Sequence, residues 1–129
     1  MDEISSALEW LRFAEMDLSS AEFLLKHKPL PKEIICFHCQ QTAEKGLKGM
    51  LVANKIRPPR IHDLKKLYAL CQSYVQNIDH IKLACNDLNQ YSVQPRYPEE
   101  LDINEQDVAE ALKQTKKVLE FLRPLFPAK

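Results

Sequence analysis

Two lysines one helical turn apart form the first candidate binding feature of this sequence. Within CFHCQQTAEKGLKGM, Lys45 and Lys48 share one side of an expected helix with Gln41 and Glu44. Two ammonium groups beside an amide have the chemistry to hold a phosphate. The alternative is a solvated helix face on which these side chains pair with one another at i,i+3 and i,i+4 spacing.

The segment YSVQPRYP brings two aromatic rings and a guanidinium together in a loop bounded by prolines. Tyr91, Arg96 and Tyr97 fit nucleotide binding, in which an arginine contacts a phosphate and a ring stacks on a base. The alternative is a core tyrosine next to a loop arginine that pairs with an acid of the following helix. The residue types leave both interpretations open.

His62 is the candidate acid–base residue, and Arg57 precedes it with four residues between them. A histidine at the start of a helix can act as a general base near neutral pH, or it can cap or pack beside that helix. Pro58 and Pro59 break any helix between the two residues, so they cannot share a helical face. We therefore expect a hinge here rather than a catalytic motif.

Cys36 and Cys39 flank His38 with a spacing similar to that of metal ligands. Zinc needs four ligands, and the other two cysteines, Cys71 and Cys85, stand alone in other segments. The first two fall on the apolar side of their helix, whereas His38 points away from it. We expect core cysteines and neither a metal nor another cofactor.

The elements that position these residues are all predicted to be helices. Apolar residues recur at helical spacing over about 3–27, 32–54, 63–74, 79–92 and from Asn104 onward, and prolines separate these segments. No segment shows the alternation that is typical of a strand. We expect an all-α fold, an antiparallel up-and-down bundle of about five helices, as a single domain over residues 1–129.

Charge is balanced overall but segregated along the chain. Eighteen basic and eighteen acidic residues give zero net charge, with basic residues dominating 32–66 and only acids among the charged residues of 99–110. Asp17, flanked by apolar positions, either faces water or is partly buried with Lys45 or Arg96 as its partner. No apolar run is long enough for a membrane span and no signal-peptide core is visible, so we expect a cytoplasmic chain with reduced thiols.

Four stretches in this order resemble the HEPN domain, the nucleotide-binding domain shared by prokaryotes and higher eukaryotes. WLRFAEMDLSSAEFLL is similar to its first helix, CFHCQQTAEKGLKGMLV to its second, and HDLKKL and LNQYSVQPRYPEE to its third helix and a following loop. The resemblance covers nearly the whole chain. It implies a homodimeric helical bundle that binds nucleotide or RNA in a cleft near the dimer interface. The matching positions are Gln41, Glu44, Lys45, Lys48, His62, Tyr91, Arg96 and Tyr97.

The resemblance also implies a biological setting. Many bacterial members are encoded beside a minimal nucleotidyltransferase and act as its toxin or partner, in a toxin–antitoxin arrangement. RNA-cleaving members carry an arginine, four to six residues, and a histidine late in the chain, whereas here no histidine follows His80. In some members the transferase adenylylates a tyrosine two positions after the histidine of this motif. Counted from His62, that position is Leu64 here. These departures argue against both catalysis and adenylylation.

We therefore expect a nucleotide- or RNA-binding module that is the toxin-like partner of a nucleotidyltransferase. Lys45, Lys48 and Arg96 would hold phosphate, and Tyr91 and Tyr97 would contact the base. One alternative is a metal-independent endoribonuclease that uses His62 with Arg57 or Arg96. Another is a protein adaptor whose acidic segment, 99–110, docks a basic partner.

Overall fold

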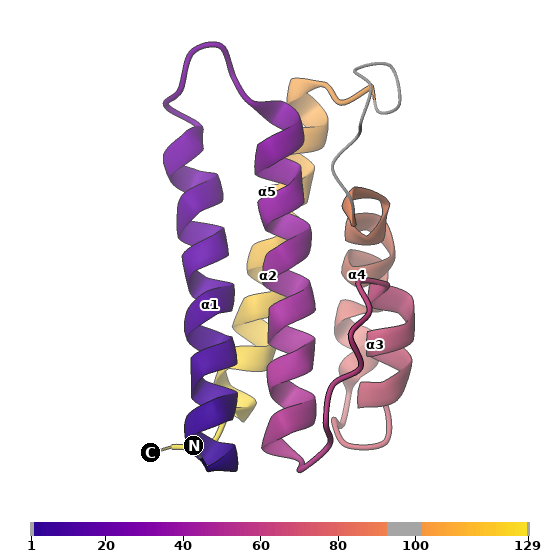
Figure 1. Cartoon of the computed structure of the whole chain (residues 1–129). Coiled ribbons are helices and arrows are strands. Elements are labelled where there is room, and N and C mark those ends of the chain that lie inside the picture. Colours follow the sequence, from indigo (N-terminus) through magenta and orange to yellow (C-terminus); the bar gives the residue numbers. More distant parts are fainter. Residues whose placement is uncertain (1, 93–101, 129) are drawn as a thin grey trace.

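The structure, a computed structural model, describes residues 2–92 and 102–128. These residues form an antiparallel bundle of α-helices without a strand, which confirms the predicted fold class (Figure 1). The α-helices are α1 (Glu3–Leu24), α2 (Lys32–Ala53), α3 (Leu64–Cys71), α4 (Lys82–Leu88) and α5 (Glu105–Leu122). Short 3₁₀ turns, η1 (Ile78–Ile81), η2 (Asn89–Tyr91) and η4 (Arg123–Leu125), extend them.

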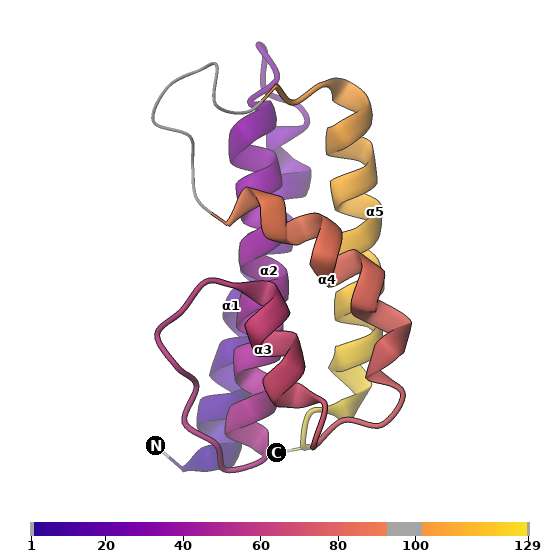
Figure 2. The same cartoon turned by 90° about the vertical axis from the view of Figure 1, so that its right-hand side faces the viewer.

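Helix α2 is the centre of the bundle. It runs antiparallel to α1, packs against α5, and is covered on another side by α3 and α4 (Figures 1 and 2). Thirteen of its 22 residues are buried, including the charged residues Glu44 and Lys48. A helix enclosed in this way must satisfy its polar side chains within the protein.

Side-chain caps set the starts of three helices. Asp2 accepts a hydrogen bond from the backbone N–H of Ser5 at 2.7 Å, and Asp63 accepts one from that of Lys65 at 2.9 Å. Asn104 caps α5 reciprocally with Asp107, as its residue type predicts. These contacts satisfy N–H groups that have no partner within their own helix.

The helix ends differ from those predicted. Helix α1 ends at Leu24 rather than near His27, where the chain turns toward two prolines. Helix α3 ends at Cys71, and the predicted helix over 79–92 is divided into η1, α4 and η2. Ile4 and Leu25, apolar residues at the two ends of α1, are exposed.

The four cysteines are free and fully buried, which confirms their predicted place in the core. Burial raises the pKa of the Cys39 thiol to about 11. It raises the pKa of the Cys36, Cys71 and Cys85 thiols to about 12. Across the described residues, no helix has the length and apolar character that crossing a bilayer requires.

Candidate functional site beside helix α2

Glu44 is the centre of a buried hydrogen-bond network on α2. Its side chain accepts from Lys48 Nζ at 3.0 Å and from Gln40 Nε2 at 3.2 Å, one helical turn to either side. Glu44 and Lys48 are only 4% and 6% exposed. The i,i+4 pairing of the alternative interpretation is present, but its solvated face is wrong for these two residues because neighbouring elements enclose α2.

His62 links the segment between α2 and α3 to this network through two contacts. Its Nδ1 lies 3.0 Å from Glu44 Oε1, and its backbone carbonyl accepts a hydrogen bond from Gln40 Nε2 at 3.0 Å. The side chain is nevertheless 63% exposed. A carboxylate therefore orients the imidazole through one nitrogen, while its other nitrogen has no partner among the described residues. This arrangement suits an acid–base group.

A second carboxylate–histidine pair joins α1 to α2. Asp17 Oδ1 lies 2.8 Å from His38 Nδ1, and Asp17 Oδ2 accepts a hydrogen bond from Lys45 Nζ. Asp17 is 9% exposed, so of the two alternatives the buried one holds, with Lys45 as a partner. The participation of His38 was missed, although His38 and Lys45 are two turns apart on one face of α2.

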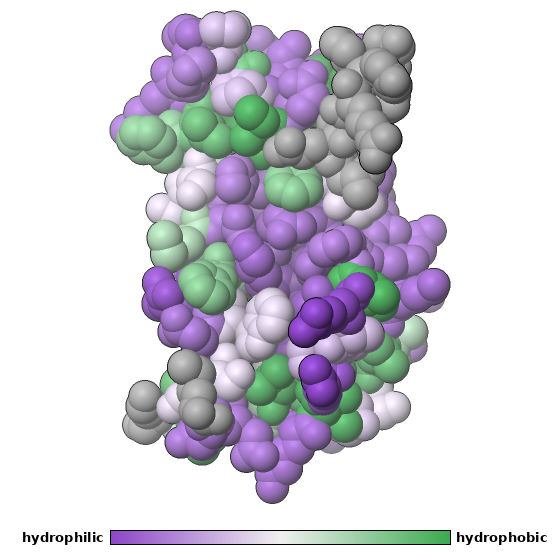
Figure 3. Space-filling view, viewed as in Figure 1, coloured by the Kyte–Doolittle hydropathy of each residue, from purple (hydrophilic) through white to green (hydrophobic). Residues whose placement is uncertain are grey.

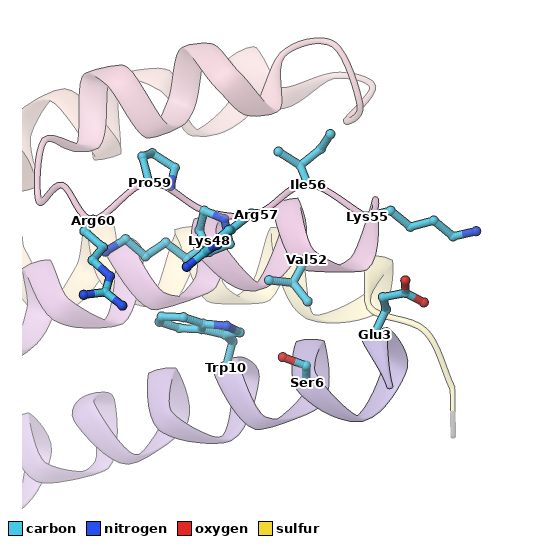
Figure 4. Close-up of a pocket in the computed structure, with 11 residues that line it drawn as sticks. Glu3, Ser6, Trp10, Lys48, Val52, Lys55, Ile56, Arg57, Pro59 and Arg60 are labelled. Atoms are coloured by element: carbon cyan, nitrogen blue, oxygen red, sulfur yellow. The ribbon is translucent and has the colours of Figure 1, made fainter. Parts of the chain in front are cut away.

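A pocket of about 450 Å³ opens between the first half of α1, the last half of α2 and the segment 54–63 (Figure 4). The segment contains no helix, as its prolines predict. Four cations and a single acid belong to the pocket wall. The lining residues are Glu3, Ser6, Trp10, Lys48, Val52, Lys55, Ile56, Arg57, Pro58, Pro59 and Arg60.

Trp10 forms one wall of this pocket, and Gly49 makes room for it. A Cβ at position 49 would lie 2.9 Å from Trp10 Cβ and 2.8 Å from the Phe126 ring, so only glycine allows α1 to approach this closely. Lys48 Nζ lies 5.9 Å from the centre of the Trp10 ring, within range of a cation–π contact. The close approach at Gly49 thus brings Trp10 beside α2, where its ring faces a cation.

The two arginines of the pocket differ from its lysine at position 48, which pairs with Glu44. Within the described part of the chain, neither Arg57 nor Arg60 has a side-chain hydrogen bond or ion pair. In Figure 4 the Arg60 side chain extends toward the Trp10 ring, whereas Lys55 points away from it. Figure 3 shows strongly hydrophilic residues gathered over the segment between α2 and α3.

The structure brings together part of the predicted site. Glu44, Lys48 and His62 meet in one network, Gln41 joins it through Glu44 at 3.4 Å, and Lys45 lies beside it on α2. Of these five, Lys48 lines the pocket that contains Arg57. Their role in binding stays a prediction.

The predicted aromatic loop is only partly described. Tyr91 is 6% exposed, and burial raises the pKa of its hydroxyl, so its ring is covered by the protein itself. Arg96 and Tyr97 lie outside the described residues. Sequence reasoning did not single out Trp10 and Arg60, which line the pocket. Their signal was an aromatic on the same side of the first helix as Asp17, and a second arginine after the proline pair.

Known proteins share both the sequence pattern and the fold. The family model described as "HEPN domain" matches residues 7–125. A protein named "Putative toxin MJ1304" from Methanocaldococcus jannaschii is 28% identical over 145 aligned positions, which cover 98% of this chain and 91% of that protein.

Two crystal structures superpose on nearly the whole chain. TT1696 from Thermus thermophilus has a TM-score of 0.77 and 27% identity, and covers 92% of this chain and 96% of its own. ST0689, described as an archaeal HEPN homologue, has a TM-score of 0.70 and 23% identity, and the match covers 94% of this chain and 98% of ST0689. The second match supports the fold alone.

Proposed function

The chain belongs to the HEPN domain family, and from that premise we propose that it is a toxin-like module that binds nucleotide or RNA. The binding surface is the polar side of α2 together with the segment 54–63. Similarity to an archaeal protein that carries a toxin name supports the toxin-like part of the proposal.

The observation that carries the proposal is the gathering of cations beside α2. Lys48, Arg57 and Arg60 line one pocket, and Lys45 lies one turn from Lys48. Glu44 neutralises Lys48 and Asp17 neutralises Lys45, whereas both arginines lack a partner among the described residues. Phosphate contacts supply much of the affinity of proteins for nucleic acids, so two free guanidiniums on one segment favour an RNA-binding surface.

Fluorescence anisotropy of a labelled single-stranded RNA tests the proposal. The double variant Arg57→Gln/Arg60→Gln removes both unpaired charges, and we expect its affinity to fall at least roughly tenfold. Lys113→Gln/Lys117→Gln removes the same charge from exposed positions on α5 and serves as the matched control. If the wild-type protein binds neither RNA nor nucleotide, the proposed function is wrong.

Metal-independent RNA cleavage is a second candidate, which the Glu44–His62 contact favours. An imidazole held by a carboxylate can take the proton of a ribose 2′-hydroxyl, whose oxygen then attacks the adjacent phosphorus. The bond to the 5′-oxygen breaks, that oxygen is protonated, and a 2′,3′-cyclic phosphate forms. Incubating mixed RNA with the protein in EDTA, beside His62→Ala, tests it. Cleavage that disappears in the variant supports the candidate, whereas no cleavage by either protein leaves a binding module.

The assembly and the partner are also part of the proposal. We propose a homodimer that associates with a minimal nucleotidyltransferase, as the family resemblance implies. Light scattering of the purified chain measures its mass in solution, and co-expression with a nucleotidyltransferase encoded beside it tests the complex. Salt-sensitive binding to a basic protein, with no nucleotide or RNA affinity, would instead support the adaptor alternative.

A further inference from the structure

We propose that the pocket between Trp10, Arg57 and Arg60 binds a single nucleoside monophosphate unit. The base stacks on Trp10 and the phosphate is held by the two guanidiniums. The unit is either a free nucleotide or the phosphate-bearing end of a single-stranded RNA. This inference rests on the proposed function and narrows it to one pocket and one class of ligand.

Trp10 provides the platform for the base. Its Cβ lies close to Gly49, which sets how near this part of α1 lies to α2. The remaining apolar lining comes from Val52, Ile56 and the proline pair, and in Figure 4 Ile56 and Pro59 lie across the pocket from Trp10. The pocket thus offers an aromatic ring and apolar groups to the flat face of a base, with the Lys48 ammonium beside the ring.

Arg57 and Arg60 provide the phosphate site. They belong to a non-helical segment, and Pro58 and Pro59 between them fix two backbone φ angles. Ordering the backbone that carries the two arginines therefore costs less conformational entropy on binding than it would in a flexible loop. Arginine binds phosphate oxygens through paired N–H donors, and neither guanidinium has another partner among the described residues.

The rest of the wall explains why the ligand is a single unit. Lys48 is held by Glu44 Oε2 at 3.0 Å and faces the Trp10 ring, so it adds positive potential without being a free phosphate ligand. Glu3 lies at the other end of the pocket from Arg60 in Figure 4 and disfavours a second phosphate there. A volume of about 450 Å³ lies within the range of small-ligand pockets, and a base within a duplex would have to leave its stack to enter.

The sole tryptophan of the chain makes the test direct. Tryptophan emission of the full chain is titrated with AMP, GMP, CMP and UMP, then with adenosine, inorganic phosphate, a 5′-phosphorylated RNA hexamer and an RNA hairpin. We expect saturable quenching by a monophosphate or by the hexamer, and at least roughly tenfold weaker binding of adenosine and of phosphate alone. Quenching by the hexamer alone identifies an RNA end as the ligand, and quenching by a monophosphate identifies the free nucleotide.

Variants assign the contacts. Arg57→Gln and Arg60→Gln are each expected to lower the affinity for the quenching ligand roughly tenfold, whereas Lys113→Gln should leave this affinity unchanged. Calorimetry with Trp10→Leu should show that ligand affinity falls roughly tenfold or more. Trp10→Phe should keep the affinity within a few-fold of the wild type because it retains a ring. The urea midpoint of each variant shows whether it is folded.

Two results would contradict the proposed binding of a nucleotide in this pocket. One is RNA binding that neither changes Trp10 emission nor weakens in Trp10→Leu, which would leave the proposed function standing at another surface. The other is inorganic phosphate binding as tightly as every nucleotide. Absence of any RNA or nucleotide binding would remove the proposed function and the pocket together.

Discussion

The imidazole Nδ1 of His62 lies 3.0 Å from the Oε1 atom of Glu44, 18 residues earlier in the chain. This contact joins the irregular segment 54–63 to the most enclosed helix of the bundle. Because Arg57 and Arg60 belong to that segment, the contact also helps to place the two arginines in the pocket that Trp10 lines. Loss of Glu44 should therefore affect both stability and ligand binding.

Replacing Glu44 by leucine should lower the free energy of unfolding by about 3–5 kcal/mol, because Lys48 would remain buried without a partner. The double variant Glu44→Leu/Lys48→Met should recover much of that loss, since apolar pairs of similar volume replace buried ion pairs well. Urea denaturation at pH 7 measures both. A single variant as stable as the wild type would show that the network contributes little.

Asp17→Asn should destabilise the protein by about 1–2 kcal/mol, because the carboxylate accepts hydrogen bonds from both His38 and Lys45 in a mostly buried position. Glu15→Gln is a matched control on the same helix. It breaks the exposed contact to Arg123 and should change stability by less than about 0.5 kcal/mol. Equal effects of the two substitutions would contradict the importance assigned to the buried cluster.

Gly49→Ala should destabilise the fold and weaken ligand binding, whereas Gly46→Ala should be close to neutral. The new Cβ at 49 would lie 2.9 Å from Trp10 Cβ, an atom close to the α1 backbone that cannot rotate away. Overpacking of this kind costs about 1–3 kcal/mol, against a gain in helix propensity of about 1 kcal/mol. At 46 the contact is 3.1 Å to the end of the flexible Leu122 side chain. Thermal and urea unfolding distinguish the two variants.

Stability should fall steeply above pH 9 because of the buried thiols. Below the ordinary thiol pKa of 9.0 the cysteines are protonated in both states, and above it the unfolded chain ionises first, since burial raises the pKa of Cys36 to about 12 and of Cys39 to about 11. One such thiol lowers the free energy of unfolding by about 1.4 kcal/mol per pH unit in this window. Urea midpoints from pH 8 to 10.5 measure the slope, and a flat profile would mean that the thiols ionise in the folded state.

Local sequence signals account for most of the fold. Apolar periodicity and prolines predicted the helices, and Asn104 predicted the start of α5, because both signals act within a few residues. The divided helix over 78–91 was not predicted. Its irregularity begins at Asn77, whose positive φ of 62° interrupts the chain in a way that apolar spacing does not reveal.

The site was less predictable because it depends on contacts between distant segments. Periodicity placed Glu44 and Lys48 on a polar face but did not show that other elements bury that face. The pairing of Glu44 with His62 and the approach of Trp10 to the 54–63 segment depend on how α1 and that segment cross α2. For Asp17 the sequence offered burial and Lys45 only as one of the alternatives, because a carboxylate among apolar positions either faces water or needs a partner.

The salt dependence of RNA binding tests the central claim most directly. Affinity of the wild-type chain for a single-stranded RNA is measured over a range of salt concentrations, beside Arg57→Gln/Arg60→Gln and Lys113→Gln/Lys117→Gln. If the two pocket arginines hold phosphate, their double variant should bind more weakly and with a log–log slope that is shallower by up to about 1.4, while the control keeps the wild-type slope. Identical slopes for all three proteins would contradict a phosphate site beside α2.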